Sequence, residues 1–182
     1  VDPEWAKYLN VIIHETERVE STLEDLFDFV GQGEIHKQEI ALTVVIRKTA
    51  LLLQSSMAKH GVTWEMECPD PEPIILGDMH QLRQVFLHLF KNALEAMPDG
   101  GKLTISVSVA DGQAIVSVVD TGPGIPESYL DKAKDPFFTT KTYGTGMGLT
   151  LVERIVGAHG GSFSLKAHPG GGLEAQVILP IQ

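Results

Sequence analysis

The chain has 182 residues, of which 43% are hydrophobic, so it carries enough apolar material for one core of ordinary size. Its formal net charge of −10 at pH 7 argues against non-specific binding to nucleic acids or to anionic membrane surfaces. The single cysteine, Cys68, excludes a disulfide framework and a multi-cysteine metal site, and we interpret it as a small apolar filler.

Targeting signals are not visible in the sequence. No apolar run reaches the roughly 18 residues that a membrane-spanning helix needs, and no signal peptide is recognisable. We therefore expect this part of the protein to lie in the cytoplasm and to make no membrane contact. Because the sequence begins with Val1 rather than Met, we expect a piece of a longer protein, which leaves a membrane anchor elsewhere open.

The first 30 residues have the pattern of a coiled-coil-like helix. Asp2 and Pro3 are favourable residues for a helix start. A largely apolar seam then recurs at alternating spacings of four and three residues: Trp5, Leu9, Ile12, Thr16, Val19, Leu23, Leu26 and Val30. A single helix cannot bury such a seam, so we expect a partner helix to cover it. Packing on the following domain is the alternative.

Residues 33–182 are predicted to form one α/β unit, and residues 1–32 a separate helical segment. Extended segments are predicted at 35–42, 62–68, 73–76, 102–110, 113–120, 162–168 and 173–180, and helices at 43–60, 78–97 and 147–159. The pair Asp111-Gly112 between two of the strands predicts a tight hairpin. Residues 121–146 are too long for an ordinary connection, and such loops are often functional.

The helix at 78–97 carries polar residues beside its apolar face. His88, Asn92 and Glu95 follow at helical spacing, so they share one side of the helix. An asparagine amide oxygen is a hard, neutral ligand that suits Mg²⁺, which takes phosphates and waters as its other ligands. The alternative is an ordinary solvated helix face.

Two glycine-containing segments could hold a ligand. In DTGPGIP, Asp120 ends an apolar run, where its carboxylate could accept from an exocyclic amine such as adenine N6 while the glycines let a flat ring approach. The alternative is a surface turn. GTGMGL at 144–149 opens a helix, and its N–H groups could face phosphate. It matches neither a P-loop nor a Rossmann fingerprint, and a plain hinge is its alternative.

Taken in order, four motifs resemble the ATP-binding domain of sensor histidine kinases, within the wider group of gyrase-, Hsp90- and MutL-type ATPases. HLFKNALEAM resembles the N box, DTGPGIP the G1 box, DPFFTTK at 135–141 the F box and GTGMGL the G2 box. The resemblance implies an α/β sandwich, in which helices and an ATP lid cover one face of a mixed sheet. Residues 15–29 are similar to the second helix of the kinase dimerisation hairpin, which favours a histidine kinase over the other relatives.

The resemblance also implies roles for polar residues of the helix at 78–97 and for Asp120. Asn92 would coordinate Mg²⁺, with Glu95 in the same motif, and Asp120 would bind adenine N6. His88 occupies a position where relatives carry Asn, His or a catalytic Glu, so it favours phosphoryl transfer over hydrolysis.

Further residues are assigned by the resemblance to the adenine pocket and to the lid. Gly122, Gly124 and Ile125 would shape the adenine pocket; Thr139, Thr140 and Lys141 would begin the lid; Gly144, Gly146, Gly148 and Leu149 would close it over the triphosphate. PGGGLEAQVILP resembles the last glycine box of the family, although Leu173 stands where a threonine is common.

The expected function is transfer of the γ-phosphate of Mg-ATP to a histidine, and then to the receiver domain of a response regulator. His14-Glu15 imitates the acceptor motif, but Val19 stands where its proline would be, so we expect the acceptor histidine to lie outside this sequence. The full protein would form a homodimer through its N-terminal helical region. The alternative function is an ATP-gated interaction module, or an ATPase or serine kinase on the same scaffold.

Overall fold

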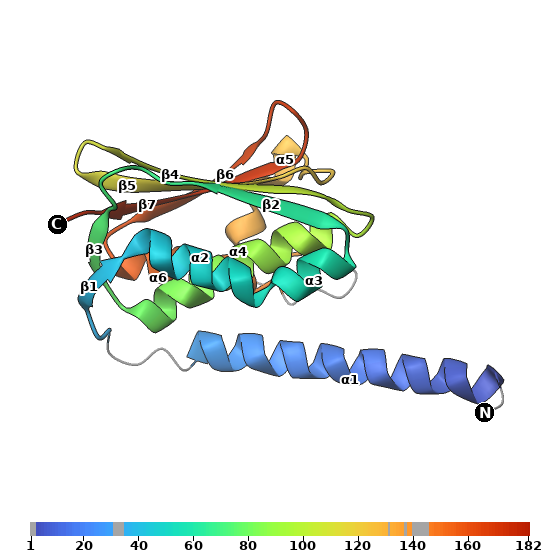
Figure 1. The fold of residues 1–182 in the computed structure, drawn as a ribbon. Coiled ribbons are helices and arrows are strands. Elements are labelled where there is room, and N and C mark those ends of the chain that lie inside the picture. Colours follow the sequence, from blue (N-terminus) through green and yellow to red (C-terminus); the bar gives the residue numbers. More distant parts are fainter. Residues whose placement is uncertain (1–2, 31–34, 131, 137, 140–145) are drawn as a thin grey trace.

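A five-stranded sheet covered on one face by helices organises the fold (Figure 1). The computed structural model describes residues 3–30, 35–130, 132–136, 138–139 and 146–182. The helices are α1 (Pro3–Val30), α2 (Leu42–Leu52), α3 (Gln54–Lys59), α4 (Met79–Ala96), α5 (Glu127–Leu130) and α6 (Gly148–Ala158), with a 3-10 turn, η1, at Lys132–Lys134. The strands are β1 (Gln38–Ala41), β2 (Val62–Glu67), β3 (Ile74–Gly77), β4 (Gly101–Ala110), β5 (Gln113–Asp120), β6 (Ser162–Ala167) and β7 (Leu173–Pro180).

The main sheet is mixed, as the sequence predicted. Its strand order is β2-β4-β5-β7-β6, with β2 parallel to β4 and the other neighbours antiparallel. A second, two-stranded antiparallel sheet joins β1 to β3. Figure 1 shows α2, α4 and α6 together on one face of the main sheet, while α1 extends away beyond this helical layer.

The hairpin between β4 and β5 sets which residues of β5 face the helices. Asp111 and Gly112 both have positive φ, at 51° and 74°, as the predicted two-residue turn requires. The side chains of β5 then alternate, so Ala114, Val116 and Val118 are buried against the helical layer. Asp120 lies two residues after Val118 and continues this alternation, so its carboxylate lies on the inner face of the sheet.

α4 is the central helix of the core. Its apolar side, including Leu82, Val85 and Leu89, is buried against the sheet as its periodicity predicted. Phe86 and Phe90 are fully buried, with ring centroids 6.2 Å apart. Deleting a ring of this kind typically costs about 3–5 kcal/mol, so α4 is held firmly in place.

Two expectations from the sequence are wrong. The helix predicted at 43–60 is divided, because Leu53 adopts ψ near 0° and its N–H bonds back to Ala50, which ends α2 before α3 begins. Cys68 is exposed rather than a core filler, because it lies beyond the last residue of the edge strand β2. Its sulfur lies 3.5 Å from Nη2 of Arg47.

α1 is the longest helix, with 28 residues, and it contacts the rest of the domain at α6. Its seam residues whose side chains are described are exposed, including Trp5 at 66% and Ile12 at 60%. Even so, no helix within the described ranges combines the length and the apolarity needed to cross a bilayer. The described part of the seam is thus an apolar stripe that this chain does not bury, and its pairing with a partner helix stays a prediction.

Candidate functional site

A row of residues along α4 lies between two glycine segments that are far apart in the sequence. His88, Asn92 and Ala96 follow at intervals of four and therefore share one face of the helix. At one end, a Cβ on Gly148 would lie 3.2 Å from Nδ1 of His88. At the other end, a Cβ on Gly122 would lie 2.8 Å from the carbonyl oxygen of Ala96. Asn92, which is half-buried, occupies the middle of this row.

Asp120 lies at the Ala96 end of the row. Its side chain is only 5% exposed, because it continues the inward-facing positions of β5. The backbone N–H of Gly122 donates to Oδ1 of Asp120 at 2.9 Å, which folds the following loop back over the carboxylate. The structure therefore brings Asp120 and Gly122 together beside the C-terminal end of α4.

The turn between β6 and β7 packs directly on this loop. Gly172 has φ +90°, and a Cβ there would overlap the carbonyl oxygen of Asp120. Gly124 has φ +72°, and its Cβ would lie 2.8 Å from the carbonyl oxygen of Gly172. The backbone N–H of Leu173 also points to Oδ1 of Asp120, at 3.4 Å. Sequence reasoning identified both glycine motifs but not their contact.

Two apolar residues of the predicted site fasten the flanking segments to the core. Ile125, after the Asp120 loop, and Leu149, in the first turn of α6, are partly buried and pack against the core. Glu95 is exposed on the last turns of α4, away from the buried side of the helix. The predicted site residues thus differ in depth, from the buried His88 to the exposed Glu95.

Part of the predicted lid falls outside the described residues: Thr140, Lys141 and Gly144. Thr139, just before this stretch, is exposed, and Gly146, just after it, has φ +67°. Gly148 then begins α6, and the N-cap position is held by Met147, whose side chain makes no capping hydrogen bond. Among the described residues, the N-cap residue of α6 thus offers no side-chain oxygen of the kind that often satisfies a helix N-terminus.

Several contacts that the sequence did not indicate fix the base of the lid segment. The hydroxyl of Thr150 donates to the carbonyl oxygen of Lys134 at 3.0 Å. Nζ of Lys134 pairs with Oε1 of Glu153 at 3.1 Å, and the rings of Tyr129 and Phe138 lie 5.7 Å apart between centroids. These contacts attach η1 and its neighbours to α6.

Asp78 caps the N-terminus of α4 and so helps to place the row that α4 carries. Its Oδ1 accepts from the backbone N–H groups of His80 at 2.9 Å and Gln81 at 3.1 Å, and its Oδ2 accepts from the N–H of His36 at 3.1 Å. Burial by itself raises the pKa of the Asp78 carboxyl, but the hydrogen bonds from Gln81, His36 and His80 outweigh this and lower that pKa below its usual value.

His159 links the end of α6 to the start of α4. Its Nε2 accepts the backbone N–H of Asp78 at 2.9 Å, while its Nδ1 lies 2.8 Å from the carbonyl oxygen of Ile155, to which it donates. These two bonds fix the neutral tautomer with the proton on Nδ1. No special role for His159 was predicted from the sequence, since its partner lies 81 positions away.

The side chains near Asn92 could hold a metal ion only if a bound ligand supplied further coordinating oxygens. Within the described parts of the chain, no three His, Cys, Asp or Glu side chains form a group that could hold a metal ion. A neutral amide oxygen beside glycine backbones fits Mg²⁺, which retains waters and takes phosphate oxygens. The residues present are therefore compatible with a metal that arrives with its nucleotide.

Comparisons with known proteins agree with this arrangement. Sporulation kinase E of Bacillus subtilis (strain 168) is 32% identical over 183 residues, covering 100% of this chain but only 25% of that protein. The catalytic domain of histidine kinase ThkA superposes with a TM-score of 0.74 at 31% identity, over 80% of this chain and 95% of that chain. Histidine kinase ThkA in complex with response regulator protein TrrA gives a TM-score of 0.84 at 27% identity, over 100% of this chain and 53% of that chain.

The predicted fold is confirmed by these structures, since the layers and the mixed sheet are those of a histidine kinase catalytic domain. The sequence profile of the family described as "Histidine kinase-, DNA gyrase B-, and HSP90-like ATPase" matches residues 77–182, which is more than half of the chain and includes the whole α4 row. The chain therefore belongs to the family of histidine kinase-, DNA gyrase B- and HSP90-like ATPases.

Proposed function

We propose that this chain is the ATP-binding catalytic domain of a sensor histidine kinase. The observation that carries the proposal is the row on α4, where Asn92 lies between Gly148 at one end and the Asp120–Gly122 loop at the other. A nucleotide lying along this row would meet a carboxylate at one end and a helix N-terminus at the other. These groups suit a base with an exocyclic amine and a chain of phosphates, respectively.

Asp120 would recognise the adenine. Its buried carboxylate can accept the N6 amino group of the base, with Ile125 as an apolar wall. Gly122 and Gly124 would shape the pocket by letting the loop pack closely on Ala96 and Gly172. A carboxylate only accepts hydrogen bonds, so it favours adenine over bases that present a carbonyl oxygen at the same place.

Asn92 would hold Mg²⁺, with Glu95 on the next turn toward the solvent. Bound Mg²⁺ would neutralise part of the negative charge on the phosphates. The N-terminus of α6, which follows Gly146 and begins at Gly148, would donate backbone N–H groups to phosphate oxygens. Thr139, Thr140, Lys141, Gly144 and Leu149 would form or flank the lid that covers them.

The reaction would be in-line transfer of the γ-phosphoryl group to a histidine imidazole. His88 lies in the row beside Gly148, at the position where relatives that hydrolyse ATP carry a catalytic Glu, and a histidine there favours transfer over hydrolysis. The acceptor histidine would be supplied by a helix outside this sequence. Catalysis would then consist mainly of positioning and of stabilising the charge on the transferred group.

We propose two partners for the whole protein: a second copy of itself and a response regulator. We assign residues 1–32 to the second helix of a dimerisation hairpin and residues 33–182 to the catalytic domain, so the exposed seam of α1 would pair in a homodimer. A response regulator would receive the phosphoryl group, in line with the regulator complex of the structural relative. Because the proposed site uses ATP, we expect this part of the protein to lie in the cytoplasm.

Calorimetric titration with Mg-ATP tests the nucleotide site. The parent chain is expected to bind, and Asp120→Asn is expected to bind at least about tenfold more weakly, because a charged acceptor of a hydrogen bond is lost. Asp111→Asn is the matched control: Asp111 lies at the exposed β4–β5 turn, where its positive φ suits asparagine. It should bind like the parent.

Two results would overturn the assignment. A well-folded parent that binds no Mg-ATP would leave the four motifs as scaffold only. Equal affinity in the parent and in Asp120→Asn would remove Asp120 from the base pocket, even if ATP binds elsewhere. Far-UV circular dichroism on each variant distinguishes loss of binding from loss of fold.

A further inference from the structure

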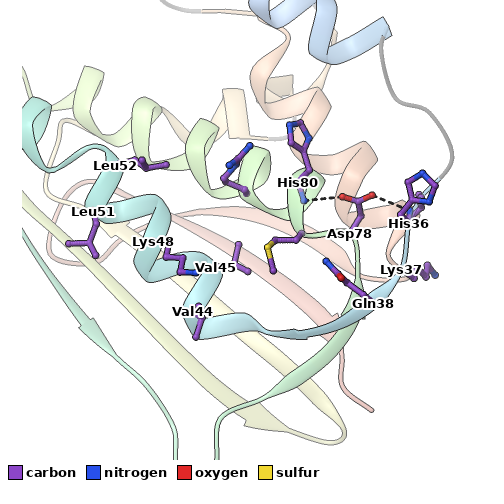
Figure 2. Close-up of a pocket in the computed structure, with 13 residues that line it drawn as sticks. His36, Lys37, Gln38, Val44, Val45, Lys48, Leu51, Leu52, Asp78 and His80 are labelled. Carbon is purple, nitrogen blue, oxygen red and sulfur yellow. Dashed lines mark hydrogen bonds between the residues drawn. The ribbon is translucent and has the colours of Figure 1, made fainter.

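A cavity of about 1120 Å³ opens between β1, α2 and the first turns of α4 (Figure 2). Its lining includes no residue of the row that carries Asn92. Its walls include the apolar side chains of Val44, Leu51, Leu52 and Met79. These four are between 40% and 67% exposed, which is unusual for side chains of this kind on adjacent elements. The cavity is therefore an open apolar surface and not part of the core.

The same cavity is rimmed by positive charge. Lys37, Lys48 and Arg83 line it, and within the described residues none of the three forms an ion pair. The single lining carboxylate, Asp78, already accepts three backbone N–H groups. We call this surface the cationic pocket. In a chain of net charge −10, a concentration of cations over apolar walls selects an acidic, apolar ligand.

One segment of this chain has that chemistry. Residues 15–28 of α1 contain six carboxylates and one arginine, ETERVESTLEDLFD. Ile13, Glu20 and Phe27 follow at intervals of seven, so they form one row on the helix. Because this row has a carboxylate between two apolar side chains and overlaps the acidic segment, we call it the acidic row. Phe27 is 71% exposed, the highest value among the described large hydrophobic side chains.

The acidic row is distinct from the apolar seam of α1. Its members come one residue after Ile12, Val19 and Leu26 of the seam, so they occupy the flanking position of a heptad repeat. This position lies at the edge of the seam, where a heptad repeat places the residues that select the partner of a helix. Within its own chain α1 contacts α6, which directs attention to another molecule as the partner of the pocket.

We propose that the cationic pocket binds the acidic row of α1 from a second copy of this chain. Phe27 supplies an apolar side chain for the walls formed by Val44 and Leu51, and Glu20 supplies a carboxylate for Lys48 and its neighbours. The contact does not depend on nucleotide binding, because the pocket shares no residue with the proposed ATP site. It weakens as salt rises, because the charges at the rim are exposed.

Zero-length cross-linking tests this contact on the full chain. Equal amounts of ¹⁴N- and ¹⁵N-labelled chain are mixed and treated with a carbodiimide, which joins a carboxylate directly to a lysine amine. Mass spectrometry is expected to find peptides of mixed isotope that join carboxylates of residues 15–28 to Lys37 or Lys48. Lys48→Glu should lower their yield about fivefold or more, since it replaces attraction by repulsion.

A charge swap and a surface control make the test specific. Glu20→Lys combined with Lys48→Glu restores opposite charges and should restore mixed-isotope cross-links, now between residues 20 and 48. Lys166→Glu, on the exposed edge strand β6, should leave the parent cross-links unchanged. The proposal is overturned if these cross-links are absent, join only peptides of one isotope, or persist undiminished in Lys48→Glu. A melting temperature measured on each variant confirms that it is folded.

Discussion

The backbone of Gly172 lies directly against the carbonyl oxygen of Asp120, so closely that a Cβ on Gly172 would overlap that oxygen. Asp120 ends β5 and Gly172 belongs to the turn before β7, so the contact joins two loops across the sheet. Gly124 packs in turn against Gly172. The position of the proposed adenine carboxylate is therefore set by a turn more than 50 residues away along the chain.

Substitution of Gly172 should weaken nucleotide binding through Asp120. Gly172→Ala must move the backbone of Asp120, and we expect the affinity for Mg-ATP to fall about tenfold or more, because small displacements of a positioning group are costly. Gly171→Ala is the matched control, since Gly171 has nearly the same φ, +89° against +90°, but no atom within 4 Å of its Cβ.

Both alanine variants carry the same backbone strain, about 1–2 kcal/mol for a positive φ. Thermal unfolding should therefore show a loss of stability in each, whereas calorimetry should show a loss of affinity only in Gly172→Ala. Equal affinities for Mg-ATP in the two variants would contradict the positioning role of the turn.

Asn92→Ala should uncouple nucleotide binding from magnesium. Alanine is the best helix former and Asn92 is only half-buried, so α4 should remain intact. We expect the parent to bind ATP more tightly with Mg²⁺ than with EDTA, and Asn92→Ala to bind about equally under both conditions. A variant that retains the full effect of Mg²⁺ would place the metal ligand elsewhere.

Asp78 should make the stability of the fold depend on pH in the acid range. Its pKa is lowered in the folded state, so its contribution is complete above the unfolded pKa of about 3.9 and is lost as pH falls through the folded value. Asp78→Asn keeps a capping oxygen but cannot titrate. Urea unfolding should therefore show a smaller loss of stability in Asp78→Asn than in the parent between about pH 5 and about pH 3.

Removal of the cap altogether should cost more. Asp78→Ala is expected to lower the free energy of unfolding at neutral pH by about 1–2 kcal/mol, the usual cost of a lost N-cap. Urea unfolding at pH 7 that shows no difference between Asp78→Ala and the parent would mean that the cap contributes nothing to α4.

The apolar seam of α1 should drive association in solution. Light scattering on the parent is expected to give a mass that rises toward a dimer with concentration. Leu23→Lys should shift this equilibrium toward monomer, because it places a charge in the seam. A monomer mass that does not change with concentration in the parent would contradict the proposal that α1 pairs.

Local patterns predicted much of the fold. The strand at 113–120, the Asp111-Gly112 turn and the apolar side of α4 each depend on neighbouring residues, and all three are confirmed. The division of the helix at Leu53 was missed, because neither glycine nor proline marks it. The exposure of Cys68 was missed since burial depends on what packs beside a strand, not on its residues alone.

The site was predicted as separate motifs rather than as an arrangement. Nothing in the sequence indicated that Gly148 touches His88, that Gly172 touches Asp120, or that His159 accepts from the start of α4. These contacts depend on the strand order and on the packing of α4 with α6. Such long-range relations cannot be obtained from periodicity or turn chemistry.

The most direct test of the central claim compares ATP with inosine triphosphate, which presents a carbonyl oxygen where adenine carries its amino group. If Asp120 accepts the N6 amino group, the parent should bind ATP at least about tenfold more tightly, and Asp120→Asn should lose most of this preference, because an amide can both donate and accept. Equal affinity of the parent for the two nucleotides would contradict the account, and so would an undiminished preference in Asp120→Asn.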